Sequence, residues 1–173
     1  MLENKELYLK LLHSLESALH DVGMKTMLCD ERGLWMLKAR LVGLGSAEGE
    51  ALMEICVPDA KFAGVNEQPL ALLQFYTTLA SHIDADNEVP ALKELNRLNM
   101  NCPLGSLHLF LNGAQLYHRY TLPLRGETLE DFLLAAADAL HLAVEVLDTI
   151  FDDALLIAHD ASKSRYGREE DSL

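Results

Sequence analysis

The sequence predicts an α+β fold, in which α-helices flank an antiparallel β-sheet. Apolar residues recur at helical spacing near both ends of the chain, and much of the region between alternates apolar and polar residues as strands do. Short turn signals such as Asn112-Gly113 join alternating segments, which favours antiparallel neighbours. The predicted order is helix, strands, helix, β-hairpin and long C-terminal helix. Residues 1–159 are expected to form a single domain around one core.

The first third of the chain predicts a helix and three strands. Residues 3–21 carry one apolar stripe, which indicates an amphipathic helix that ends at Gly23. Residues 24–42 alternate on both sides of a turn and predict a hairpin, and residues 51–57 predict a third strand. The glycines at positions 43, 45 and 49 lack the Lys-Ser/Thr of a phosphate-binding loop, so we interpret them as turn residues.

The middle of the chain predicts a strand followed by a helix. Residues 69–81 include a β-branched and aromatic run from Phe75 to Thr78, which favours a strand over a helix. Capping residues then precede Pro90, and proline is tolerated in a first helical turn. A helix is therefore expected from this point to about Asn99.

The hairpin after this helix has a predictable register. A two-residue turn at Asn112-Gly113 places Leu109 opposite Leu116 and Leu107 opposite His118. The leucines and His118 then share one face, and the other face holds Ser106, His108, Phe110, Gln115, Tyr117 and Arg119. Because this register puts His108 and His118 on opposite faces, we do not expect a metal site between them.

Three asparagines near the start of the hairpin are candidate structural residues. Asn99 is expected to cap the helix, because asparagine tolerates the left-handed backbone and its amide bonds nearby backbone groups. Asn101 and Pro103 are expected to steer the chain into the strand. Asn96 is expected to hold the helix against a neighbouring loop.

The last predicted element is a long helix from the N-cap Thr128 to about His159. Its apolar residues cover more than half of its circumference, whereas a helix that only lies on a sheet needs a stripe roughly 100° wide. We therefore expect a second contact besides the sheet, with the first helix, a second copy of the chain or a client protein. Residues 160–173 are polar and mixed in charge, and they predict a disordered tail.

An acidic row repeats every seven residues along this helix, opposite its apolar seam: Asp131, Asp138, Glu145 and Asp152. No Lys or Arg occurs between Glu127 and His159. The row is either a solvated face that keeps the protein soluble or a docking surface for a basic partner. Asp152 and Asp153 lie near the negative end of the helix dipole, which predicts fraying or a cationic neighbour.

Charge and hydropathy argue against several classes of partner. Twenty-seven acidic residues against fourteen Lys and Arg give a net charge of -13, which opposes binding to nucleic acid or anionic lipid. No apolar run has membrane-spanning length, so membrane insertion is not expected. The N-terminus lacks the pattern of a signal peptide, which favours the cytoplasm.

The chain contains no recognisable catalytic or cofactor-binding motif. Cys29, Cys56 and Cys102 match no disulfide or zinc spacing, and we expect them to be reduced. We therefore expect a non-enzymatic protein with no cofactor and no metal. The alternative is a small enzyme or ligand-binding domain with an unrecognised Cys/His/carboxylate site.

The segment 92–133 carries a family resemblance. Its helix ends in LNRLN, followed by PLG at positions 103–105, a hairpin, and a strand that closes in LPL. This pattern resembles YbjN-domain proteins, a family associated with sensory-transduction regulation, and the related α+β fold of type III secretion chaperones. The resemblance covers about residues 70–150 and adds Gly105 to the structural candidates. It implies a cytoplasmic, non-enzymatic protein, commonly a homodimer, that offers apolar patches to an extended segment of a client or regulatory partner.

Aromatic side chains are the expected anchors for such a protein partner. Phe110 and Tyr117 lie on the second face of the predicted hairpin, and Phe132 and Phe151 lie beside the helix seam. The alternative, that each is a core residue beneath a helix, is the commoner situation for any one aromatic side chain.

Overall fold

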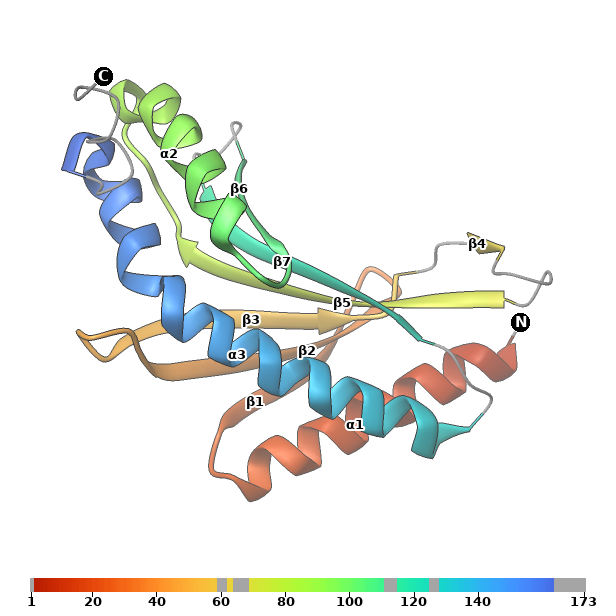
Figure 1. Cartoon of the computed structure of the whole chain (residues 1–173). Helices are drawn as coiled ribbons and strands as arrows, with labels where there is room; N and C mark the ends of the chain where they lie inside the picture. The colour runs from red at the N-terminus through yellow and green to blue at the C-terminus, as the bar shows by residue number, and fades with distance from the viewer. Residues whose placement is uncertain (1, 59–61, 64–68, 111–114, 125–127, 164–173) are drawn as a thin grey trace.

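The computed structural model describes residues 2–58, 62–63, 69–110, 115–124 and 128–163, and it confirms the α+β fold (Figure 1). None of the described helices is both long and apolar enough to cross a membrane. The elements follow one another in this order: α1 (Leu2–Asp21), β1 (Lys25–Glu31), β2 (Leu34–Leu44), β3 (Gly49–Cys56), β4 (Phe62–Ala63), β5 (Pro69–Ala80), η2 (Ala85–Asn87), α2 (Glu88–Asn101), β6 (Ser106–Phe110), β7 (Gln115–Leu124), α3 (Leu129–Asp160) and η3 (Ala161–Lys163).

The sheet runs in the order β1-β2-β3-β5-β7-β6, with every neighbouring pair antiparallel. The two-residue β4 pairs with the beginning of β5, off this path. In the last hairpin Leu107 pairs with His118 and Leu109 with Leu116, so the predicted register is confirmed. The turn that predicted it, Asn112-Gly113, lies outside the described residues.

Local backbone chemistry explains the first two connections. Gly23 ends α1 with φ +83°, and its N–H donates to the carbonyl of His20 at 2.9 Å. The β1–β2 turn places Arg32 at φ +58° and Gly33 at φ +88°, the left-handed pair that tight hairpins favour. Asp30 Oδ1 accepts the Gly33 N–H at 2.6 Å, which secures the turn.

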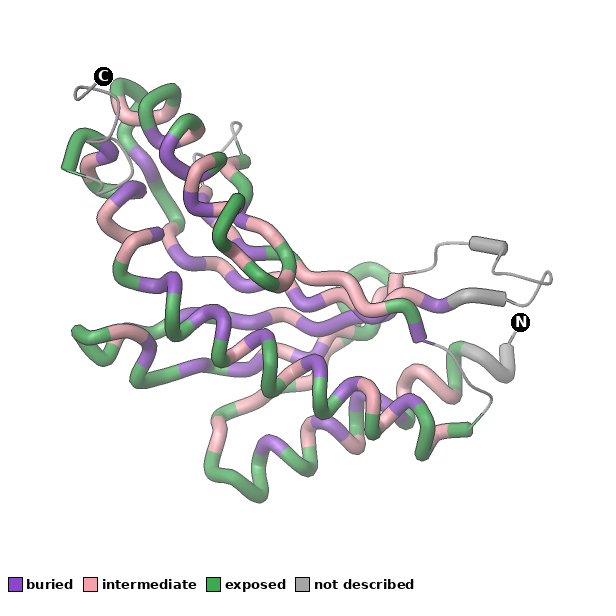
Figure 2. Tube along the Cα trace, in the orientation of Figure 1, coloured by how far each residue is buried: buried purple, intermediate pink, exposed green. Residues whose placement is uncertain are grey.

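The hydrophobic core lies between the three helices and one face of the sheet. Alternate strand residues are buried on that face, as β2 illustrates with Leu37, Ala39 and Leu41 (Figure 2). In Figure 1, α3 runs across this face, while α1 contacts β1 and β2, and α2 contacts β6. Strand alternation thus directs the apolar side chains of the sheet toward the helices.

The breadth of the apolar surface of α3 follows from its neighbours, because the helix packs against α1 and α2 as well as the sheet. It starts with the capping box formed by Thr128 and Asp131. At its end, the Asn87 amide donates to the carbonyls of Ile157 and Ala158 at 2.9 and 3.0 Å, and its oxygen accepts the Ala161 N–H at 3.1 Å. Asn87 therefore satisfies backbone groups that a helix end leaves free.

The folded part of the chain extends beyond the boundary expected at residue 159. The helix continues to Asp160, and the turn Ala161–Lys163 follows with Ala161 buried. The burial of a small apolar side chain there explains the difference, since its contact favours an ordered turn over a solvated chain. The rest of the expected tail, residues 164–173, lies outside the described residues.

Candidate protein-binding surface

The second face of the sheet, which we call the open face, is not covered by any helix or strand that the structure describes (Figure 1). Its side chains alternate with the core residues along each strand. On β2, for example, Lys38, Arg40 and Val42 point away from the helices, and the last two are exposed. Nearly all side chains on this face are at least partly accessible to solvent.

Four large apolar side chains on the open face are exposed to an unusual degree. They come from four strands and are exposed by 42 to 64%: Met27, Val42, Leu52 and Phe110. Single exposed apolar residues need no explanation. Here Met27, Val42 and Leu52 lie on three neighbouring strands, and Phe110 lies on the opposite edge strand, which makes the open face a candidate surface for interaction. Phe110 was one of the predicted anchors, and it is accessible for that role.

A stack of three rings crosses the open face from β5 to β6. Tyr76 and Tyr117 stack with centroids 4.4 Å apart, and His108 stacks on the other side of Tyr117 at 5.2 Å. Ser106 Oγ lies 2.7 Å from His108 Nε2, and Gln115 Nε2 donates to Thr78 Oγ1 at 3.1 Å. Tyr117, the second predicted anchor, therefore forms the centre of a rigid, partly exposed aromatic surface.

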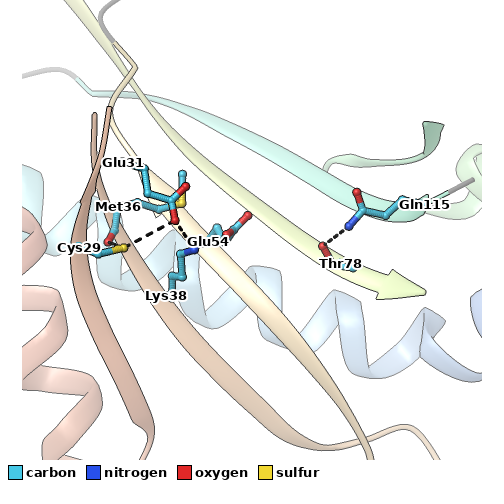
Figure 3. A network of polar contacts seen from close by, with 7 residues as sticks. All are labelled: Cys29, Glu31, Met36, Lys38, Glu54, Thr78 and Gln115. Carbon is cyan, nitrogen blue, oxygen red and sulfur yellow. Dashed lines mark hydrogen bonds and ion pairs between the residues drawn. The ribbon is translucent and has the colours of Figure 1, made fainter. Parts of the chain in front are cut away.

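Most charged side chains on the β1–β3 part of the open face lie in ion pairs, and Figure 3 shows those of Lys38. The Lys38 ammonium pairs with Glu31 and, at 3.2 Å, with Glu54. Hydrogen bonds to these carboxylates raise the pKa of Lys38, and the bond from Lys38 lowers the pKa of Glu31. Arg40 forms an ion pair with Glu50.

Phe132 and Phe151, the other two predicted anchors, lie in the core instead of on a binding surface. Their exposed fractions are 5% and 1%. The Phe132 ring lies beside that of Tyr8 in α1, at 6.5 Å. A Cβ at Gly49 would overlap the ring of Phe151, so that ring packs directly on the backbone of β3. Both side chains pack between α3 and other elements of this fold. Neither is accessible to a partner protein.

Asn99 does not cap α2 as predicted but bonds the backbone of β6. Its Nδ2 donates to the Leu107 carbonyl at 2.9 Å, and its Oδ1 accepts the Leu107 N–H at 2.7 Å. The helix continues through Asn101, and the cap is Cys102, whose N–H donates to the Asn99 carbonyl at 3.2 Å. Hydrogen bonds from the asparagine side-chain amide to nearby backbone groups were predicted and are present. The prediction of a left-handed backbone is wrong, because none of the three asparagines has positive φ.

The neighbouring candidates have smaller roles. Asn101 lies in the last helical turn and donates to the Arg97 carbonyl at 3.5 Å, so it extends the helix instead of steering the chain. Asn96 is exposed on α2, and no hydrogen bond among the described residues involves it, so the expected contact with a loop is not present there. Pro103 follows the cap, at the position where a helix cannot continue.

Gly105 allows the chain to pass closely over β7. Its φ is +72°, and a Cβ there would lie 2.5 Å from His118 Nε2. His118 is buried, and its Nε2 is 2.9 Å from the Leu104 carbonyl, so this ring nitrogen carries the hydrogen that it donates. Burial lowers the pKa of His118, which favours a neutral ring. The PLG segment is therefore a packing site on the core face, and His108 lies on the opposite face as predicted.

The acidic row of α3 is divided among three environments. Asp131 belongs to the capping box, and Asp138 and Glu145 are exposed. Asp152 Oδ2 accepts the Ser46 N–H at 2.8 Å, and Asp148 Oδ1 accepts the Gly45 N–H at 2.8 Å. Hydrogen bonds from the side chain and the backbone N–H of Ser46 lower the pKa of Asp152, so the groups that stabilise this carboxylate come from Ser46 and not from a cation. The glycine-rich turn is held by α3 and is not a phosphate site.

At each edge of the sheet, a side chain of this chain bonds backbone groups of one residue of the edge strand. Glu16 of α1 accepts the N–H of Leu28 in the edge strand β1 at 3.0 Å. At the other edge, the Asn99 amide takes both backbone groups of Leu107, as an added strand would. In the sequence, each of these contacts depends on a single side chain, Glu16 or Asn99. Their bonding partners are 12 and 8 residues away along the chain.

The alternative of a Cys/His/carboxylate site gains little from the geometry. Burial raises the pKa of Cys56 to about 11 and also raises that of Cys102, which disfavours the reactive thiolate. Two wide-open surface hollows of about 430 and 590 Å³ flank His159. The ion pairs at these hollows, His82 with Asp84 at 3.5 Å and Lys163 with Asp160 at 3.0 Å, are at least partly exposed. No group of three metal-ligating His, Cys, Asp or Glu residues occurs in the described ranges.

Comparison with known proteins does not assign the chain to a family. The sequence matches no known protein family, and no curated protein is significantly similar to it. The resemblance to YbjN-domain proteins therefore depends on the quoted residues alone.

Proposed function

We propose that this chain is a non-enzymatic protein-binding module, which binds a segment of a partner protein on the open face of its sheet. The observation that carries this proposal is the open face itself. It combines the exposed side chains of Met27, Val42, Leu52 and Phe110 with the aromatic stack centred on Tyr117. Rigid aromatic side chains next to accessible apolar ones are typical of interaction hot spots.

The occupied sheet edges support binding on the face over binding by strand addition. A peptide that extends a sheet needs free backbone N–H and C=O groups on an edge strand. Glu16 and Asn99 use such groups on β1 and β6. A partner that approaches the open face displaces neither of these bonds.

The biological setting of the module is part of the same proposal. The resemblance to YbjN-domain proteins and secretion chaperones favours a chaperone-like or regulatory role in the cytoplasm, with a second copy of the chain as a further partner. Light scattering tests the homodimer: a mass of one 19.2 kDa chain across micromolar concentrations contradicts it.

Affinity capture with matched variants tests the function. The tagged chain is recovered from its own cells together with the variants Leu52→Ser and Phe110→Ser. The control is Leu134→Ser on α3, since Leu134 is 68% exposed but lies on the helical side. We expect a protein recovered in stoichiometric amounts by the wild type and the control, and depleted at least about tenfold by the open-face variants. Equal recovery by all four proteins contradicts the proposal.

A further inference from the structure

Arg119 is an exposed cation at the centre of the β5–β7–β6 part of the open face. It pairs with Tyr76 across β5 and with Ser106 across β6. Along β7 its neighbours on the same face are Tyr117 and Thr121. Arg119 is therefore surrounded by four side chains that each carry a hydroxyl group.

Arg119 takes part in none of the ion pairs that the described residues form on the open face. Among the described residues, the face carries three carboxylates, and each has a cationic partner: Glu31 and Glu54 with Lys38, and Glu50 with Arg40. Its other two cations, Lys25 and Arg119, have no ion-pair partner within the part of the chain that the structure describes. Four cations against three carboxylates give the described part of this face a surplus of positive charge.

This surplus is opposite in sign to the charge of the whole chain. The net charge is -13, and α3, on the other side of the sheet, contains no Lys or Arg. Charge therefore favours a negatively charged ligand on the open face over the rest of the surface. Two unpaired cations are few for a polyanion such as nucleic acid, whose binding needs many phosphate contacts, but they fit one or two carboxylates.

We propose that Arg119 binds a carboxylate of an acidic protein segment that lies across the open face. A guanidinium donates two parallel hydrogen bonds to a carboxylate, and the hydroxyl groups of Ser106 and Thr121 lie within the same patch. Apolar side chains of the segment contact the ring of Tyr117 and the exposed ring of Phe110. This inference depends on the proposed function and specifies the chemistry of the partner.

Selection from a displayed library of random nine-residue peptides tests the inference, with the intact chain immobilised. We expect enrichment of peptides in which Asp or Glu stands near aromatic or aliphatic residues, although the chain is acidic overall. Arg119→Gln is expected to weaken the selected peptides roughly tenfold or more. Arg119→Glu is expected to abolish their binding. The control Lys93→Gln changes charge equally at an exposed position on α2, and it is expected to bind as the wild type does.

Each other result contradicts a defined part of the account. Enrichment of basic peptides, or acidic peptides that bind Arg119→Gln as well as the wild type, overturns the role of Arg119. If those peptides are still lost in Leu52→Ser, the open face keeps its proposed function. Peptides insensitive to Leu52→Ser, Phe110→Ser and Arg119→Gln, or no enriched peptide at all, overturn both proposals. Unchanged thermal unfolding of each variant ensures that the losses are not caused by unfolding.

Discussion

The two faces of the sheet place their polar groups in different environments. On the helix-covered face, Thr77 and His118 pair across β5 and β7 with exposed fractions of 0% and 1%, and Thr77 Oγ1 has no hydrogen-bond partner among the described residues. On the open face, Lys38 is bonded by two carboxylates that are still partly accessible. Stability is therefore concentrated on the covered face, and the open face can be altered at little cost to folding.

Adjacent residues of β5 make this contrast measurable. Phe75 is 1% exposed on the covered face and stacks on Tyr120 at 5.8 Å, while Gln74 lies on the open face. Phe75→Ala is expected to lower the free energy of unfolding by about 3–5 kcal/mol, because it removes a buried ring and leaves a cavity. Gln74→Ala is expected to change it by about 0.5 kcal/mol or less. Urea unfolding of both variants measures the difference, and equal losses contradict the contrast.

The two asparagines near the end of α2 give a second comparison. Asn99→Ala is expected to cost about 1–3 kcal/mol, because it leaves the N–H and C=O of the buried Leu107 without their partner. Asn101→Ala removes only an exposed bond of 3.5 Å and is expected to cost about 0.5 kcal/mol or less. Amide exchange at Leu107 should accelerate in the first variant alone. Slow exchange there in Asn99→Ala means that another group protects β6.

The buried His118 predicts a pH dependence of the covered face. Its pKa is lowered from the ordinary 6.5, mainly by burial, so the unfolded chain binds the proton more readily than the folded chain. The resulting stability is fully present above pH 6.5 and is lost as the pH falls from that value through the lower pKa of the folded state. His118→Gln should lose less stability than the wild type between pH 7 and 5. Parallel pH profiles of the two proteins contradict this assignment.

The smallest effect is expected on the open face. Lys38→Gln removes two partly exposed ion pairs and is expected to change the free energy of unfolding by about 1 kcal/mol or less. The pKa of Glu31 should return toward its ordinary 4.5, since the bond from Lys38 is the main cause of its lowering. An NMR titration of the Glu31 carboxyl measures this change. A large loss of stability would indicate that the open face carries part of the fold.

Patterns within one element predicted the fold well. Strand alternation in β2 and β7 assigned the two faces, and the turn signal at Asn112-Gly113 predicted the pairs Leu107–His118 and Leu109–Leu116. The helical period and the cap at Thr128 predicted α3 to within about one residue at each end. These features depend on local backbone geometry, which neighbouring residues determine.

Contacts between distant segments could not be predicted in the same way. The bonds of Asp148 and Asp152 to the glycine turn join residues more than 100 positions apart, and no spacing rule connects them. Phe132 and Phe151 were assigned to a partner surface because the sequence does not specify where α1 and β3 lie against α3. The importance of Arg119 became visible only when the other charges of its face were found in pairs.

Site-specific photo-crosslinking in living cells identifies the surface of the protein that contacts a partner. A photoreactive phenylalanine analogue replaces Leu52 on the open face or Leu134 on α3, both of which are exposed. The account predicts a covalent adduct to a discrete protein partner from position 52 and none from position 134. Adducts from position 134 alone would contradict it and would identify the acidic helix as the binding surface.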